Sequence, residues 1–143
     1  MVKLLANGYI ESIDKVEGYL KDLKSILCSD DFDLNRDIDI LYGIKTDSAG
    51  YKNAETIAAL EYDKSNIRDT LLALTVNEYS ETFADIKDSV SPPLYVFGKT
   101  IATHEIYIKV KIRSSNARQV FCISFHFAQY HISKPYSTKK EQL

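Results

Sequence analysis

The stretch E-I-Y-I-K-V-K-I-R-S-S-N-A-R-Q-V-F-C-I-S-F-H-F (residues 105–127) decides the fold, because apolar and polar residues alternate on both sides of a short polar break. Successive side chains of a strand point to opposite faces of its sheet. The alternation therefore predicts two strands, at 105–113 and 119–127, joined by a turn at 114–118. A connection this short favours antiparallel pairing of the two strands.

The same alternation predicts which side chains share a face of this hairpin. The buried face is expected to hold the apolar residues Ile106, Ile108, Val110, Ile112, Phe121, Ile123, Phe125 and Phe127. The polar face is expected to hold Tyr107, Lys109, Lys111, Arg113, Cys122, Ser124 and His126. A histidine, several cations and a phenol would then share one surface.

Upstream of the hairpin, apolar residues recur at spacings of three and four, which is typical of amphipathic helices. Helices are predicted at 9–28, 53–62 and 62–74. The last of these is expected to be capped by Asp63 or Ser65. The segment 31–53 is rich in aspartate and turn residues, and we expect it to be a long loop.

Two prolines in S-V-S-P-P (89–93) separate this helical half from the strand-forming half, because proline continues neither a helix nor a central strand. A further strand is predicted at 94–99. Helices followed by a meander of strands indicate an α+β fold, with N-terminal helices packed on one face of a small antiparallel β-sheet. The 143 residues suit one domain, to which residues 1–50 contribute a helix and a loop.

Composition favours a soluble protein of the cytoplasm. Hydrophobic residues make up 45% of the chain and charged residues 27%, which is usual for a globular domain rather than a disordered one. Cys28 and Cys122 form neither a metal-binding spacing nor a disulfide framework, which favours a reducing compartment. No apolar run has the length of a membrane span or the form of a signal peptide. We therefore expect no membrane partner.

Charge is unevenly distributed along the chain. Residues 1–90 carry 10 Lys and Arg against 18 Asp and Glu, a net charge of −8. Residues 91–143 carry 8 basic and 2 acidic residues, a net charge of +6, together with all three histidines. Such segregation is typical of a protein that presents one face to phosphates. The alternative is a chance separation of solvated faces.

The polar face of the hairpin carries the groups that metal-free cleavage of an RNA phosphodiester requires. A base removes the ribose 2′-OH proton, cations stabilise the phosphorane, and an acid protonates the departing 5′ oxygen. His126 is the candidate acid or base, because its ordinary pKa lies near neutrality. Lys99 and Lys109 are candidate phosphate ligands, and Tyr107 is a candidate for base stacking or proton donation. The alternative is a solvated face on which His126 only forms hydrogen bonds.

Two other groupings of reactive side chains are less favoured. Cys122, Ser124 and His126 lie at i, i+2 and i+4 of one strand, so their side chains would run parallel rather than towards one another. His104, His126 and His131 lack nearby clustered carboxylates and the helical spacing of a metal site. We therefore predict no metal and no other cofactor, and interpret the cysteines as small apolar residues.

Four runs in this chain resemble the MqsR-family toxins of bacterial type II toxin–antitoxin systems, in the Firmicutes-type branch of that family. The runs are L-A-L-T-V-N-E-Y-S-E (72–81), L-Y-V-F-G-K (94–99), E-I-Y-I-K-V-K-I (105–112) and V-F-C-I-S-F-H-F-A-Q-Y (120–130). The resemblance covers about residues 57–136, within a toxin-like core at 53–136. It implies a RelE-like fold and an mRNA interferase, an endoribonuclease that cleaves single-stranded mRNA and is neutralised by a cognate protein antitoxin.

The resemblance also implies roles for particular residues. The family's functional tyrosine falls on Tyr107, and its basic residue at the end of the S-F-x strand falls on His126, where the shorter toxin carries a lysine. A further family lysine falls near Glu81, so its role is absent here, has moved to Lys99, or has passed to Glu81 acting as a base. The predicted catalytic residues are His126, Tyr107, Lys109 and Glu81. The predicted substrate-binding residues are Lys99, Lys111, Arg113 and Tyr130.

Two alternatives to an enzyme stay open at this point. The first is a non-catalytic module that keeps the fold and binds RNA or a protein. The second is a protein whose acidic N-terminal half is an autoinhibitory or partner-docking element. The sequence pI of about 5.9 favours either alternative, because toxins of this type are often basic. A homodimer is also left open.

Overall fold

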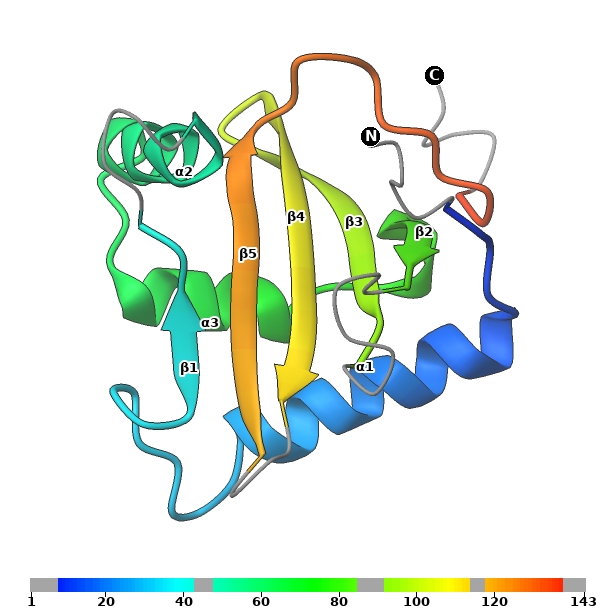
Figure 1. Cartoon of the computed structure of the whole chain (residues 1–143), viewed down its shortest axis with the longest axis horizontal. Coiled ribbons are helices and arrows are strands. Elements are labelled where there is room, and N and C mark those ends of the chain that lie inside the picture. Colours follow the sequence, from blue (N-terminus) through cyan, green and yellow to red (C-terminus); the bar gives the residue numbers. More distant parts are fainter. Residues whose placement is uncertain (1–7, 43–47, 85–91, 114–117, 138–143) are drawn as a thin grey trace.

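The fold is taken from a computed structural model, which describes residues 8–42, 48–84, 92–113 and 118–137, and of residues 48–51 only the backbone. Helices and strands follow one another in the order shown in Figure 1. They are α1 (Ile13–Leu27), β1 (Ile38–Ile40), α2 (Ser48–Ala59), α3 (Lys64–Leu72), the short 3-10 helix η1 (Val76–Glu78), β2 (Tyr79–Phe83), β3 (Leu94–Ile101), β4 (His104–Arg113) and β5 (Gln119–Phe127).

The strands form one mixed sheet in the order β1-β5-β4-β3-β2. Neighbours from β2 to β5 pair antiparallel, as expected for a meander, whereas β1 pairs parallel with β5. The α+β prediction is therefore confirmed, and the prediction of a wholly antiparallel sheet is wrong. A parallel neighbour needs a long crossover, and here α2, α3 and three further strands lie between β1 and β5 in the chain.

The predicted helices and hairpin strands are confirmed within a few residues, but the long loop at 31–53 is wrong. That segment contains β1 and the start of α2. Strand β2, at the end of the predicted helical half, was also not expected. Both missed strands are only three and five residues long, so neither displays enough alternation to be recognised. The predicted turn at 114–118 lies almost wholly outside the described residues, and the break at 89–93 lies largely outside them.

Helices α1 and α3 cover one face of the sheet, and α2 lies beside the upper end of β5 (Figure 1). Ser12 caps α1, its hydroxyl accepting a hydrogen bond from the Lys15 N–H at 3.2 Å. Of the two predicted caps of α3, Asp63 is the one used, in a capping box with Asn66. Among the described residues, no helix is long and apolar enough to cross a membrane.

The core lies between the sheet and helices α1 and α3. Fully buried side chains of β3, β4 and β5 meet there, among them Phe97, Ile108 and Phe125. Tyr79 of β2 is also fully buried, and its hydroxyl lies 2.7 Å from Thr82 Oγ1 while accepting a hydrogen bond from the Glu11 N–H at 2.9 Å. Its polar end is thus satisfied, which removes the cost of burying a hydroxyl.

A β-bulge in β5 corrects the predicted faces of that strand. Lys109 pairs with Ser124 and the next residue, Val110, pairs with Cys122, so Ile123 is an extra residue. One extra residue reverses the alternation beyond it. As a result Cys122 and Phe125 are both fully buried in the core, and Phe121 lies opposite Lys111 on the other face. The prediction of Cys122 on the polar face and Phe121 on the buried face is wrong, whereas Ser124 and His126 do share a face with Tyr107 and Lys109.

Candidate functional site

The sheet face turned away from α1 and α3, here called the outer face, carries the polar residues of the hairpin. Tyr107 of β4 pairs with His126 of β5, and Gly98 of β3 lies on the other side of Tyr107. One pleat further along, Lys109 pairs with Ser124. Val96 separates Lys109 from Glu81 of β2 in that same row. Strands β2, β4 and β5 thus hold Glu81, Lys109, Tyr107 and His126 on one surface, with β3 between β2 and β4.

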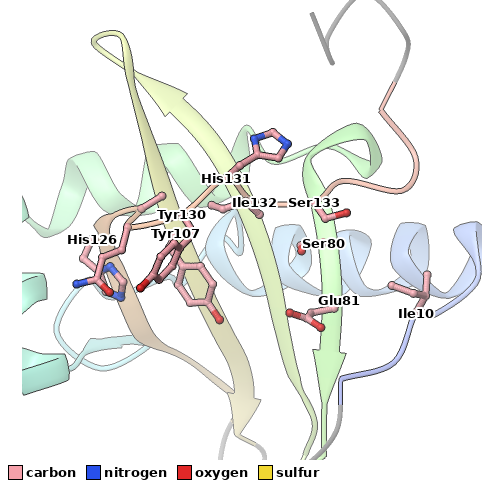
Figure 2. Close-up of a pocket in the computed structure, with 11 residues that line it drawn as sticks. Ile10, Ser80, Glu81, Tyr107, His126, Tyr130, His131, Ile132 and Ser133 are labelled. Carbon is pink, nitrogen blue, oxygen red and sulfur yellow. The ribbon is translucent and has the colours of Figure 1, made fainter.

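A cavity of about 520 Å³ opens on this face (Figure 2). Its walls come from β2, β4, β5, the segment that follows β5 and Ile10 of the segment before α1. The lining residues are Ile10, Ser80, Glu81, Tyr107, His126, Ala128, Gln129, Tyr130, His131, Ile132 and Ser133. Three of the four predicted catalytic residues and one predicted substrate contact, Tyr130, therefore meet at one cavity. The fourth catalytic candidate, Lys109, lies beside it, and its charge interacts with that of Glu81.

His126 is held in a defined orientation. Its ring stacks on that of Tyr107, with 5.3 Å between the ring centroids and 16° between the planes. Its Nδ1 lies 3.1 Å from the carbonyl oxygen of Phe127. A carbonyl oxygen can only accept, so the hydrogen bond places a hydrogen on Nδ1. In the neutral ring Nε2 is then the basic nitrogen that can take a proton.

The surroundings shift three pKa values in this site. Burial lowers the pKa of His126, and the positive charges of Lys52 and Lys109 lower it further, while the bond to the Phe127 carbonyl acts against them. Burial raises the pKa of Tyr107, and the Glu81 carboxylate adds to the rise. Burial lowers the pKa of Lys109, against the opposing effect of Glu81. His126 is therefore neutral and Tyr107 protonated at neutral pH.

The segment 128–137, here called the strap, forms one wall of the cavity and crosses the outer face. Glu105 of β4 anchors it, because its carboxylate accepts hydrogen bonds from the Ile132 N–H at 3.3 Å and from Lys134 Nζ at 2.6 Å. The strap also lies close over Gly98, where an added Cβ would sit 2.9 Å from Lys134 Cε and 3.0 Å from the Ile132 side chain. Figure 2 shows His131 of the strap directed away from His126.

Apart from Tyr130, sequence reasoning did not identify the residues of the strap as part of the site. Its residues follow no strand or helix period, so periodicity gave no indication of their position. One available signal was Gly98, since a glycine inside a strand often marks the close approach of another segment.

Other predicted substrate contacts lie outside the cavity. Lys99 points to the opposite face of the sheet, where its Nζ lies 3.1 Å from Glu78 Oε2 and 3.5 Å from the Ala73 carbonyl oxygen. The structure thus does not bring Lys99 together with His126. Arg113 lies further along β4, stacks over the Phe121 ring at 3.7 Å and donates to Gln119 Oε1 at 2.8 Å.

Lys111 lies between Lys109 and Arg113 on the outer face, opposite Phe121. Three basic residues therefore follow one another at every second position of β4, leading away from the cavity. Alternate residues of a strand are about 6.6–6.8 Å apart. This basic line runs along the sheet surface and starts at the catalytic candidates.

The remaining reactive side chains do not form a second centre in the described part of the chain. Cys122 is buried in the core, which raises its pKa to about 12, and Cys28 is the exposed residue that caps α1 at its C-terminal end. Among the described residues, no group of three His, Cys, Asp or Glu is placed to hold a metal ion.

Comparison with known proteins gave no relative for this chain. It matches no family model, no curated protein and no solved structure.

Proposed function

We propose that this protein is a metal-independent endoribonuclease that cleaves single-stranded mRNA. The observation that carries the proposal is the meeting of His126, Tyr107 and Glu81 at one cavity, with Lys109 beside them. These residues come from three strands separated in the chain, and the cavity holds a neutral imidazole, a protonated phenol and a carboxylate. Together with a cation, they are the groups that phosphodiester cleavage by a neighbouring 2′-OH requires.

In the proposed reaction, Nε2 of His126 takes the proton of the ribose 2′-OH. The 2′ oxygen then attacks the phosphorus and the bond to the 5′ oxygen breaks, leaving a 2′,3′-cyclic phosphate and a 5′-hydroxyl. Tyr107 donates the proton that the departing 5′ oxygen needs, because its raised pKa keeps the phenol protonated. Lys109 stabilises the negative charge of the phosphorane. Glu81 is the second candidate for the base, since it faces the same cavity.

Three further features support an RNA substrate. The line of Lys109, Lys111 and Arg113 on β4 leads from the cavity and is suited to a phosphate backbone. Tyr130, which is 83% exposed at the cavity, is placed to stack on a base. The four sequence runs that resemble MqsR-family toxins add a RelE-like arrangement and a cognate protein antitoxin in the bacterial cytoplasm to the proposal.

The test is cleavage of a long single-stranded RNA by the purified protein in the presence of EDTA. Wild type is expected to cleave, and His126→Ala is expected to lose roughly 100-fold or more in rate while keeping its RNA affinity. His104→Ala is the matched control, because His104 lies at the start of β4 outside the cavity, with its ring against Phe127. This variant should cleave as wild type does.

An RNA that wild type binds but leaves intact would contradict the nuclease and support the non-catalytic module. Growth arrest on induction, relieved by the product of a neighbouring gene, would support the toxin role in particular. Equal cleavage by wild type and His126→Ala would remove His126 from the mechanism.

A further inference from the structure

Along the C-terminal half of β5, helix α2 supplies the hydrogen bonds that a neighbouring strand would otherwise make. Strand β1 pairs with β5 only from Val120 to Cys122, and the Leu41 N–H extends this pairing by one bond to the Cys122 carbonyl at 3.0 Å. Beyond Cys122, the same edge of β5 faces α2 (Figure 1). The backbone groups there need partners, because an unpaired buried N–H or C=O is costly.

Two side chains of α2 supply those partners. Asn53 is fully buried, and its Nδ2 donates to the carbonyl oxygens of Leu41 and Ile123, both at 2.8 Å. Its Oδ1 accepts from the Phe125 N–H at 2.9 Å. Thr56 is 2% exposed, and its Oγ1 accepts from the Phe127 N–H at 3.0 Å. Asn53 thus bonds to both sides of Ser124, directly across the bulge.

These bonds bear on His126 for two reasons. The bulge at Ile123 decides that His126 lies on the outer face, since regular alternation from buried Cys122 would direct it into the core. In addition, the N–H groups immediately before and after His126, those of Phe125 and Phe127, are the two that Asn53 and Thr56 hold. The same helix places Lys52 close enough for its charge to act on the His126 ring.

We infer that Asn53 and Thr56 are positioning residues for His126: their hydrogen bonds to the β5 backbone stabilise the bulge and thereby hold the His126 ring against the Tyr107 ring. The inference rests on the proposed nuclease function, because it concerns the same site. Neither residue touches the cavity, so neither is expected to contact RNA. Their contribution should therefore fall on the rate of the chemical step rather than on substrate affinity.

Two substitutions remove these bonds with little change in shape. Thr56→Val deletes the acceptor for the Phe127 N–H, whereas Thr56→Ser keeps a hydroxyl. Asn53→Asp keeps an acceptor for the Phe125 N–H but replaces the Nδ2 donor with an oxygen. That oxygen faces the carbonyl oxygens of Leu41 and Ile123 and cannot donate to them. Thr70→Val is the matched control, since Thr70 is a buried helical threonine whose hydroxyl donates to Asn66 within α3.

Two measurements are made on each folded variant of the full chain. NMR follows the Tyr107–His126 ring contact and the exchange protection of the Phe125 and Phe127 amides. Steady-state kinetics on RNA in EDTA separates kcat from KM. We expect Thr56→Val and Asn53→Asp to weaken the ring contact and to lower kcat roughly 10- to 100-fold at nearly unchanged KM. Thr56→Ser should keep most of the Tyr107–His126 ring contact and most of kcat, and Thr70→Val should change neither the ring contact nor kcat.

A wild-type ring contact and wild-type kcat in folded Thr56→Val would overturn the inference, even if Asn53→Asp does not fold. A fall in thermal stability with unchanged ring contact and kcat would show a merely structural role and would also overturn it. The NMR measurement does not depend on cleavage. If wild type fails to cleave RNA, the proposed function fails, while the ring contact still decides whether α2 positions His126.

Discussion

At the scale of the residue, His126 shows how a common side chain acquires a defined chemical state. The bond from Nδ1 to the Phe127 carbonyl selects the tautomer, and burial disfavours the charged form. Two lysines on different elements, Lys52 of α2 and Lys109 of β4, disfavour it further. A lysine at this position, as in the shorter toxin of the family that the sequence resembles, would remain a cation, whereas this histidine is suited to remove a proton.

The pH dependence of cleavage tests this state. A base must be neutral to act, so kcat/KM should rise through the His126 pKa, with a midpoint below the ordinary value of 6.5 because that pKa is lowered. The raised pKa of Tyr107 places the alkaline limb above pH 10. The measurement is a pH–rate profile in EDTA between pH 4.5 and about 9, where RNA itself is stable enough to serve as substrate.

Lys52→Gln supplies the control for that profile. Removing a cation near the ring stabilises the protonated imidazole, so the acid limb should move up towards pH 6.5. An acid limb with its midpoint above pH 6.5 in wild type would show that another group is the base, whereas a rate that falls as the pH rises through the His126 pKa would show that His126 acts as the acid.

At the scale of the element, the bulge of β5 decides more of the site than any single side chain. One extra residue at Ile123 moves Phe125 into the core and His126 out of it. The sequence does not display the bulge, because Phe121, Ile123, Phe125 and Phe127 read as one uninterrupted apolar face. The bulge is stabilised from outside the strand by Asn53, which is 70 residues away in the chain from Ile123.

Two phenylalanine substitutions distinguish a bulged β5 from a regular one. Phe125→Ala should cost about 3–5 kcal/mol in the free energy of unfolding, because it empties a site in the core. Phe121→Ala should cost only about 1 kcal/mol, because Phe121 is partly exposed and mainly loses its contact with Arg113. Urea denaturation followed by circular dichroism measures both. Equal costs would contradict the bulge, since a regular strand would bury both rings on one face.

At the scale of the whole molecule, the uneven charge along the sequence gives the outer face of the sheet a line of basic residues that the α1 side lacks. The basic second half forms β3, β4, β5 and the strap, and it places Lys109, Lys111 and Arg113 in a line on the outer face. Helix α1, on the opposite face, presents acidic and basic residues together. A net charge of −2 therefore does not oppose RNA binding at the outer face.

The salt dependence of RNA binding measures this arrangement. If Lys111 contacts a phosphate, Lys111→Ala should weaken binding of single-stranded RNA and reduce the slope of log K against log salt by about 0.7. Lys21→Ala on the exposed surface of α1 is the matched control and should leave the slope unchanged. The measurement is fluorescence anisotropy with the His126→Ala protein, so that the RNA stays intact. Equal effects of the two substitutions would place the RNA elsewhere.

The sequence by itself determined the features that repeat along the chain. The 3.6-residue period of α1, the start of α3 at one of two candidate caps, Asp63 or Ser65, and the alternation of β4 are local, because each depends on neighbours a few residues apart. Alternation in β4 also placed Tyr107 and Lys109 correctly on one face, and pairing with β5 brought Ser124 and His126 to the same side.

Only the tertiary structure decided which of these residues form the cavity. Glu81 lies at the cavity because β2 pairs with β3. The strap forms a wall of the cavity because Glu105 binds Lys134 and because Gly98 leaves room for the strap to pass. Lys99 lies outside the cavity because its side chain points to the opposite face and contacts Glu78 of η1. The parallel pairing of β1 and the bulge in β5 likewise depend on contacts between distant segments. Such contacts follow from burial and hydrogen-bond satisfaction in the folded chain, and no local period of the sequence encodes them.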